Sequence, residues 1–325
     1  NALDLSRCVY RSYGLSYRSD YIYFPEKIAE LLESGLMRSC VGINADGQVV
    51  SHLALNFITT KSKVGETGQA VVDPRYRGRG LFEKMKKYLA EYSKDVGDYG
   101  FYSESVSIHP FTQKGNLALG AHETGILLGY VPEGVQFKKI QGGEQSVRQT
   151  TVLFYMKINQ EPHRKAYLPE KHSDMLKKIF EINNLDREIC EAENYDLNEL
   201  SEVSQFDLKV RPEWGFAFLV IHQFGKDIYE QIKYHLINLK LQKIECIYLD
   251  MPISDKWTSY FNKSFESLGF FFSGIIPELY EGDTYRLQYL NNVRIDKDKI
   301  YAVSDFAKEL LDYTLVEMDN SIKYD

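Results

Sequence analysis

The chain has little of what membrane-spanning, metal-finger and nucleic-acid-binding proteins need. No apolar run approaches the roughly 18 residues of a membrane-spanning helix, and no signal peptide is visible. The four cysteines, Cys8, Cys40, Cys190 and Cys246, lie far apart without a CxxC pair. Acidic residues (46) outnumber basic ones (39), so no general attraction to nucleic acid exists. We therefore expect no membrane contact, no metal site, no nucleic-acid partner, and reduced thiols in a cytoplasmic protein.

What the chain does contain is the composition of a packed globular protein. The hydrophobic fraction is 44% and the aromatic fraction 14%. A length of 325 residues is large for a single core, which favours two domains. The chain begins with Asn-Ala rather than Met, which is compatible with its being part of a longer multidomain chain.

The spacing of apolar residues predicts mixed helix and strand throughout. In the first half we expect helices from residues 5, 25, 81 and 112, and strands over 37–43, 49–57, 66–72, 101–108, 123–131 and 147–158. The helix from residue 81 should place Glu83, Lys84, Lys86 and Lys87 on its outer face.

A polar, proline-containing segment over 161–165 resembles a linker, and it predicts one domain over 1–160 and a second over 161–325. In the second half we expect helices near 173, 227, 255 and 304, the first capped by Ser173. Strands are expected over 204–210, 215–222, 245–251, 271–277 and 284–290.

A short internal echo connects the two halves. Gly120 and Gly125 end a helix and open a strand, and Gly269 and Gly274 repeat that spacing in the same sequence context. The shared order of elements favours a duplicated fold.

The most informative segment runs from Val71 and Val72 through Arg77-Gly78-Arg79-Gly80 to Leu81. A strand ends, an Arg- and Gly-rich turn follows, and an amphipathic helix begins. This layout directs free backbone N–H groups and the positive end of a helix to one point, which is how proteins bind phosphate. The alternative is a simple strand-to-helix turn with solvated arginines.

With its preceding Val72-Asp73-Pro74, this segment resembles the signature of the GCN5-related N-acetyltransferase (GNAT) superfamily, and the element order of the first half is similar too. The resemblance implies an α/β (α+β) fold of tandem GNAT-like domains, each a mixed, mostly antiparallel twisted sheet flanked by helices. It also implies acetyl-coenzyme A as cofactor. The backbone of Arg77, Gly78, Arg79, Gly80 and Leu81 would hold its pyrophosphate, and Val71 and Val72 would pair with its pantetheine arm.

One residue departs from the family signature. Phe82 stands where a small residue is usual, and it either packs inward or crowds the pyrophosphate. Its helical spacing with Met85 and Leu89 favours inward packing.

The resemblance leaves the catalytic groups less defined. The tyrosine that serves as acid in the family aligns with Asn116, whose amide cannot supply a proton. His109, at the end of a strand, is a candidate base, or it replaces an asparagine in a structural role. Glu66 and Glu104 on neighbouring strands are further candidate bases, or outward-facing surface groups. His52 fits a partly buried core histidine better.

The second half resembles the same fold without its chemistry. Where the Arg- and Gly-rich turn should stand, the chain reads Phe224-Gly225-Lys226-Asp227, with one glycine, no arginine and an aspartate that would repel phosphate. We interpret 161–325 as a degenerate GNAT-like domain that supports the first half, mediates dimerisation or shapes the substrate site.

The leading hypothesis is therefore an acyl-coenzyme A-dependent N-acyltransferase, transferring acetyl from acetyl-coenzyme A to an amine by direct attack in a ternary complex. The acceptor would be a small-molecule amine or a protein lysine or N-terminal amine, and an oligomer is compatible with the sequence. The alternative is a module that binds acyl-coenzyme A and regulates a partner without turnover. A cofactor-free interaction protein is the third hypothesis.

Overall fold

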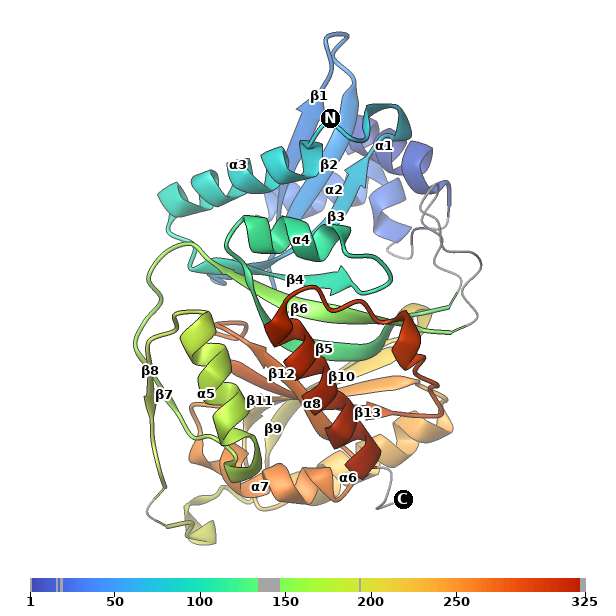
Figure 1. Cartoon of the computed structure of the whole chain (residues 1–325). Helices are drawn as coiled ribbons and strands as arrows, with labels where there is room; N and C mark the ends of the chain where they lie inside the picture. The colour runs from blue at the N-terminus through green and yellow to red at the C-terminus, as the bar shows by residue number, and fades with distance from the viewer. Residues whose placement is uncertain (1, 16, 18–19, 134–146, 193, 322–325) are drawn as a thin grey trace.

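The computed structural model describes residues 2–15, 17, 20–133, 147–192 and 194–321. Its centre is one 11-stranded, mostly antiparallel sheet with helices packed against it (Figure 1). The strands follow the order β1-β2-β3-β4-β6-β5-β12-β13-β11-β10-β9. The α/β fold class expected from the sequence is confirmed.

The elements of the first half lie close to their predicted positions. The helices are α1 (Ala2–Tyr13), α2 (Pro25–Glu33), α3 (Leu81–Val96) and α4 (Phe111–Ala118). The strands are β1 (Met37–Ile43), β2 (Val49–Asn56), β3 (Val64–Val72), β4 (Gly100–Val106), β5 (His122–Val131) and β6 (Gln149–Lys157).

The second half adds two short strands that the sequence did not predict, β7 (Arg164–Ala166) and β8 (Arg187–Ile189), which pair with each other. Its main strands are β9 (Gln205–Arg211), β10 (Phe216–Gln223), β11 (Cys246–Pro252), β12 (Phe271–Ile276) and β13 (Thr284–Leu290). Its helices are α5 (Ser173–Ile182), α6 (Ile228–Leu241), α7 (Lys256–Glu266) and α8 (Asp305–Ser321). The residue that precedes α5 as N-cap is His172, so the predicted cap at Ser173 is wrong.

The two halves repeat one arrangement of strands. The order β9-β10-β11-β13-β12 matches β2-β3-β4-β6-β5, and the pair β10–β11 is parallel as is the pair β3–β4, while the other neighbours within each half are antiparallel. Helices α6 and α7 occupy the same places in this order as α3 and α4.

The halves meet through a close approach of two glycines. Gly125 of β5 pairs with Gly274 of β12, and these are the glycines of the sequence echo. A Cβ on Gly125 would lie 2.3 Å from the carbonyl oxygen of Ser273, and a Cβ on Gly274 would lie 2.4 Å from the Cα of Gly125. We call this contact between β5 and β12 the seam. A side chain extends it, because Gln288 of β13 accepts from the Leu128 N–H at 3.0 Å and donates to the Leu128 carbonyl oxygen at 2.6 Å.

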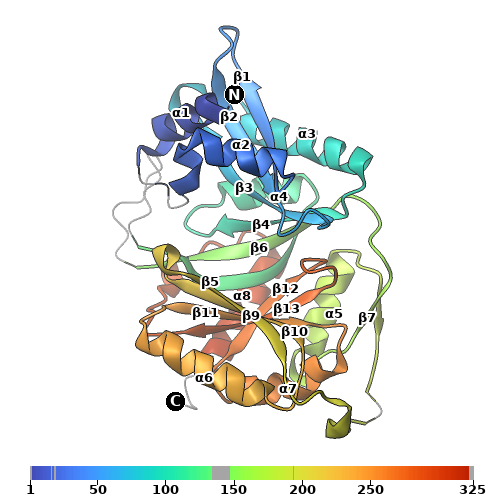
Figure 2. The same cartoon turned by 180° about the vertical axis from the view of Figure 1, so that it is seen from behind.

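The sheet has two different faces. Helices α1 and α2 cover β1–β3 on one face through a cluster that includes Leu5, Val9 and Ile28, while α3 covers the opposite face through Met85 and Leu89. In the view of Figure 2, α1 and α2 lie at one end of the molecule and the strands β4, β6 and β5 cross its middle.

The segment predicted to be a linker takes part in a buried ion network, while its His163 and Lys165 are exposed. Glu161 is buried, and Arg187 of β8 bridges it to the turn between β12 and β13, with 2.5 Å between Arg187 Nε and an oxygen of Asp283. Arg164 makes a further ion pair with the buried Glu278 at 2.8 Å. Glu161 and Arg164 of this polar segment therefore belong to an ion network.

Within the described residues, none of the helices is both long and apolar enough to cross a membrane.

Candidate functional site

The Arg- and Gly-rich turn lies exposed between β3 and α3. Gly78 has φ 77° and Gly80 has φ 67°, and Gly80 is the N-cap of α3 without a side-chain capping bond. Both angles lie in the left-handed region that favours glycine. An added Cβ at either glycine would meet no atom within 4 Å, so the space in front of the turn is open. The start of a 16-residue helix therefore presents its first N–H groups to solvent.

A buried aspartate fixes the base of the turn. Asp73 is 1% exposed and accepts from the Arg75 side chain at 2.8 Å and from Arg11 of α1 at 2.9 Å. The side-chain hydrogen bond from Arg75 is the main reason that the pKa of Asp73 lies well below its usual range. The Arg75 guanidinium is thus engaged in hydrogen bonds to Asp73. Arg77 donates to the carbonyl oxygen of Val72 at 3.3 Å, and its side chain remains exposed beside that of Arg79.

Strands β3 and β4 pair only at their beginnings. Their parallel register runs from Val64 opposite Gly100 to Glu66 opposite Tyr102 and stops there. β3 nevertheless continues to Val72, and over 67–72 it has β2 as neighbour on one side only. The divergence leaves one edge of β3 without a strand partner just before the glycine turn, where an extended ligand could add hydrogen bonds.

A bulge interrupts β3 in this unpaired stretch. Opposite β2, the register moves from His52 facing Val71 to Ala54 facing Gly68, and Gln69 has φ 52°. The buried His52 makes a hydrogen bond from Nδ1 to the Gln69 carbonyl oxygen at 3.1 Å. Burial lowers the pKa of His52 to about 4, so its ring is neutral at pH 7 and supports the bulge from the core. The interpretation of His52 as a core histidine agrees with this placement.

Glu66 and Glu104 are brought together on the face of the sheet away from α3 and α4. They are half-buried, and within the described part of the chain neither forms an ion pair. Burial, followed by the charge of Glu104, raises the pKa of Glu66 to about 8. Burial also raises the pKa of Glu104, against the opposing effects of Arg286 and of a hydrogen bond with Tyr130. Both carboxyl groups therefore hold their protons more strongly than ordinary glutamates, and carboxyl groups with raised pKa values are frequent at functional sites.

His109 lies elsewhere. It follows the end of β4 by three residues, is half-buried, and its ring lies 5.3 Å from that of Phe111. Burial lowers its pKa, so the imidazole is neutral at pH 7. No contact joins His109 to Glu66 or Glu104 among the described interactions, so the three predicted bases do not form one group.

Asn116 belongs to a buried polar cluster that the sequence interpretation missed. Lys86 of α3 is 1% exposed and donates to the Asn116 side-chain oxygen, so the prediction that Lys86 lies on the outer face of α3 is wrong. Asn116 in turn donates to Ser105 at 2.7 Å and to Ser103 at 3.1 Å. Desolvation lowers the pKa of Lys86 to about 7. The signal available in the sequence was weak, because Lys86 follows the inward Met85 directly.

Phe82 packs inward, as its spacing predicts. It contacts the cluster that contains Met85 and Leu89. It also approaches α4, because a Cβ on Gly115 would lie 3.5 Å from its ring. The ring therefore fills the space between α3 and α4 rather than the space in front of Gly80.

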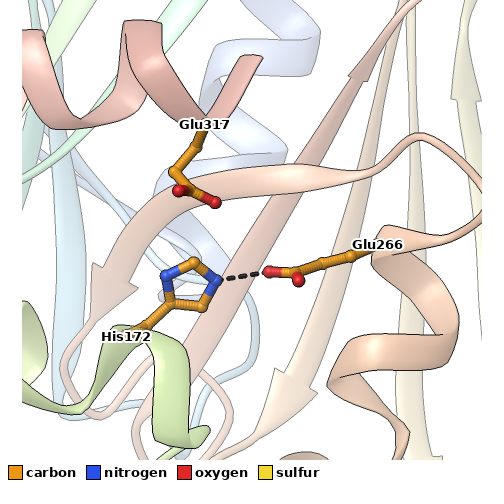
Figure 3. A group of neighbouring side chains, drawn as sticks. All are labelled: His172, Glu266 and Glu317. Carbon is orange, nitrogen blue, oxygen red and sulfur yellow. Dashed lines mark hydrogen bonds and ion pairs between the residues drawn. The ribbon is translucent and has the colours of Figure 1, made fainter. Parts of the chain in front are cut away.

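A second group of titratable residues lies far along the chain, at the junction of α5, α7 and α8 (Figure 3). His172 Nε2 lies 2.5 Å from Glu266, and its Nδ1 lies 2.6 Å from the Tyr313 hydroxyl. Lys171 pairs with Glu317 and lies 3.5 Å from Glu266. Both ring nitrogens are engaged and a lysine supplies the positive charge, so this group holds three helices together as an ion network.

One family model matches the first part of the chain. Residues 6–110 match the model of the acetyltransferase (GNAT) family. This match includes β3, the glycine turn, α3, and both Glu66 and Glu104. A search of curated proteins gave no match.

Solved structures similar to the chain include several acetyltransferases. The ribosomal-protein-S18-alanine N-acetyltransferase of Escherichia coli is 12% identical over 50% of this chain and 90% of its own, with a TM-score of 0.38. The ribosomal-protein-S5-alanine acetyltransferase of Vibrio fischeri is 15% identical over 50% and 90%, with a TM-score of 0.39. A phosphinothricin acetyltransferase of Sinorhizobium meliloti, solved with AcCoA, is 14% identical over 49% and 86%, with a TM-score of 0.39.

Proposed function

We propose that the chain is an acyl-coenzyme A-dependent N-acyltransferase that moves an acetyl group from acetyl-coenzyme A to an amine, and the match of residues 6–110 to the acetyltransferase (GNAT) family model supports this. The observation that carries the proposal is the exposed turn from Arg77 to Gly80, which begins α3 beside the unpaired edge of β3. A phosphate at the helix start and an extended arm along the strand would use both features together.

The residues of the turn fit this ligand. The backbone N–H groups from Arg77 to Leu81 would hold the pyrophosphate, and the open space in front of Gly78 and Gly80 admits it. The backbone of Val71 and Val72 would pair with the pantetheine arm, while the Val71 side chain stays buried under α1. When bound, the thioester supplies an activated acetyl group.

Glu66 and Glu104 suit the proton transfer that this reaction requires. The substrate ammonium must first lose a proton, because only the neutral amine can attack the thioester. The new C–N bond then forms as the C–S bond breaks and the thiolate of coenzyme A leaves. In its ionised form, a glutamate whose pKa is near 8 is a stronger base than an ordinary glutamate, and the ionised fraction grows as the pH rises toward 8. We assign the base to the Glu66–Glu104 pair in preference to His109, because the pair lies where β3 and β4 diverge.

The second half is proposed to be a degenerate copy without a cofactor site. Where the first half has an open turn, the second is filled by its own chain. A Cβ on Gly225 would lie 2.5 Å from the backbone nitrogen of Ser204. The Asp227 carboxylate accepts from Ser204 at 2.8 Å and 2.6 Å, which places a negative charge at the start of α6. A phosphate would meet both a steric block and a like charge.

Binding of acetyl-coenzyme A to the intact chain tests the proposal through thermal unfolding. Ligand at about 100 times its dissociation constant should stabilise the fold by about 2.7 kcal/mol. Gly80→Asp should remove this stabilisation because it adds a negative charge at the helix start. Gly35→Asp is the matched control, since Gly35 has φ 77° and open surroundings but lies after α2. If acetyl-coenzyme A does not raise the melting temperature of the unchanged chain, the cofactor assignment is wrong.

A sensor without turnover is the second candidate, favoured by the burial of Asn116 where the family has its acid. Release of free thiol across a panel of amines separates the two candidates. In a transferase, Glu66→Gln should lower kcat at least tenfold while the thermal shift with acetyl-coenzyme A persists. Thermal stabilisation by acetyl-coenzyme A, without release of free coenzyme A thiol in the presence of any of the amines, would favour the sensor.

A further inference from the structure

One face of the second half is built from strands and turns alone. Phe218 of β10 pairs with Tyr248 of β11, and each is followed by a leucine, Leu219 or Leu249, that belongs to the cluster shared with the helices. The hydrophobic cluster around Tyr248 contains no residue of an α-helix within the described chain. Among the described residues, no α-helix packs against these aromatic side chains, and the one helical contact is Trp214 of a short 3-10 helix (Pro212–Trp214), which stacks on Phe216.

The same cluster continues into the first half. The ring of Tyr130 of β5 lies 5.2 Å from Phe216 and 6.0 Å from Tyr248. Tyr102 of β4 packs against this cluster and stands in register with Glu66. Glu104 of β4 hydrogen-bonds with Tyr130. The candidate carboxylates thus adjoin aromatic rings from both halves, across the seam of the sheet.

The charges of this face are of both signs. Arg286 of β13 donates two hydrogen bonds to Asp250, at 2.6 and 2.7 Å, which neutralise it. Its guanidinium lies 5.0 Å from the centre of the Phe218 ring. Glu66 and Glu104 carry the acidic charge of the first half, while Lys209 and Arg211 of the edge strand β9 stand in register with Phe218 and Phe216. A cation would therefore place its charge at the two carboxylates and its apolar body toward the rings.

These groups are reachable. Five of them retain partial solvent exposure: Glu66, Tyr102, Glu104, Tyr130 and Phe218. Aromatic faces and a carboxylate together favour an organic cation, because the rings bind the apolar body and the positive charge while the carboxylate pairs with the ammonium.

We propose that the acceptor site is shared between the halves, and that it takes a small primary amine with an apolar body. The carboxylates of the first half hold the ammonium, and the aromatic face of the second half holds the body. We call the residues of this site the shared cluster, and its members are Glu66, Tyr102, Glu104, Tyr130, Phe218, Tyr248 and Arg286. The inference rests on the proposed function, since it names the acceptor of that reaction.

Calorimetric titration of the intact chain with three probes, 2-phenylethylamine, tryptamine and cyclohexylmethylamine, tests this assignment without turnover. At least one should bind, and at least tenfold more tightly than 2-phenylethanol, which lacks the charge, and ethanolamine, which lacks the apolar body. Failure of all three amines to bind, or equal binding of the uncharged alcohol, overturns the proposal.

Two variants locate the binding. Phe218→Ser removes a ring contributed by the second half, and Glu104→Gln removes charge at nearly constant shape; each should weaken the amine at least tenfold. Tyr234→Ser is the matched control, because Tyr234 is an exposed aromatic residue of α6. Amine affinity unchanged by both Phe218→Ser and Glu104→Gln overturns the shared site, with melting temperatures checking that each variant is folded.

The acetyl-coenzyme A shift, measured on the same variants, separates this inference from the proposed function. Suppose that Phe218→Ser keeps the normal thermal shift with acetyl-coenzyme A and leaves the KM for the acceptor unchanged. The acceptor would then bind in the first half alone, and the transferase assignment would stand. Loss of the cofactor shift in the unchanged chain would instead remove the proposed function.

Discussion

At the scale of single residues, Lys86 differs most from what its sequence position suggests. Its ammonium is enclosed between α3 and α4 with Asn116, Ser103 and Ser105 as the polar groups around it, and no carboxylate pairs with it among the described contacts. A buried charge with only neutral partners is costly. The lowered pKa of Lys86 is the result of that cost.

This placement makes the stability of the chain depend on pH in a defined direction. The folded pKa of Lys86 is about 7 and its unfolded value is near 10.5, so the unfolded chain binds more protons between these values. The Lys86 contribution to the free energy of unfolding should therefore rise from pH 7 to pH 10, by a few kcal/mol.

Lys86→Met should remove this dependence and gain stability at pH 7, because it keeps the length of the side chain without the charge. Urea unfolding of both proteins at pH 7 and pH 9 measures the difference. Parallel pH profiles for the two proteins would show that Lys86 is not buried as described. Lys84→Met, on the exposed side of the same helix, is the control.

At the scale of elements, the buried ion network connects β8 with the β12–β13 turn and with the chain after β6. Arg187 is 1% exposed, and its partners Glu161, Glu278 and Asp283 are equally enclosed. Removing one member of a buried network leaves the remaining charges without compensation, which costs much more than the loss of a surface pair.

Arg187→Met should accordingly destabilise the chain by about 3–5 kcal/mol. Lys178→Met, which removes the exposed pair between Lys178 and Glu309, should change stability by less than about 1 kcal/mol. Denaturant titration measures both. Similar small losses for the two variants would contradict the network as the element that fixes this segment.

Most element positions could be predicted from the sequence because apolar spacing is a local property. The strand over 37–43 and the strand over 284–290 have the predicted bounds. The role of 161–165 as a linker stays a prediction. The ion pairs of this segment were not visible in the sequence, since Arg164 pairs with Glu278, which is more than a hundred residues distant. The glycine turn was visible because one short segment supplies all its parts. The shared cluster was not, because Tyr130 and Tyr248 meet only once the sheet is complete.

At the scale of the molecule, the single sheet depends on the contact of Gly125 with Gly274. The carbonyl oxygen of Thr124 would lie 2.4 Å from a Cβ on Gly274, whose φ of 130° is also rare for other residues. The glycines of the sequence echo are thus required where the halves touch. The division at residues 160 and 161 and the duplication of the domain stay predictions, which the repeated strand order supports.

Gly274→Ala should destabilise the chain by about 3 kcal/mol or more, because the strands at the seam must separate or shift. Gly282→Ala is the control, since no atom lies within 4 Å of its added Cβ, and it should be neutral or slightly stabilising. Calorimetry should give one unfolding transition for the unchanged chain and a lower or divided one for Gly274→Ala. An unaltered melting temperature would contradict the close approach.

The meeting of β5 and β12 also determines what happens when the chain is cut. A fragment over 1–160 would keep the glycine turn but would expose the edge of β5 that meets β12 at Gly125, on a strand whose side chains are almost all buried in the intact chain. Such an open, apolar strand recruits another strand. Two copies of the fragment would therefore pair through β5, each replacing the β12 that the other lost. The second half then protects the first from self-association, in addition to any part it takes in binding the acceptor.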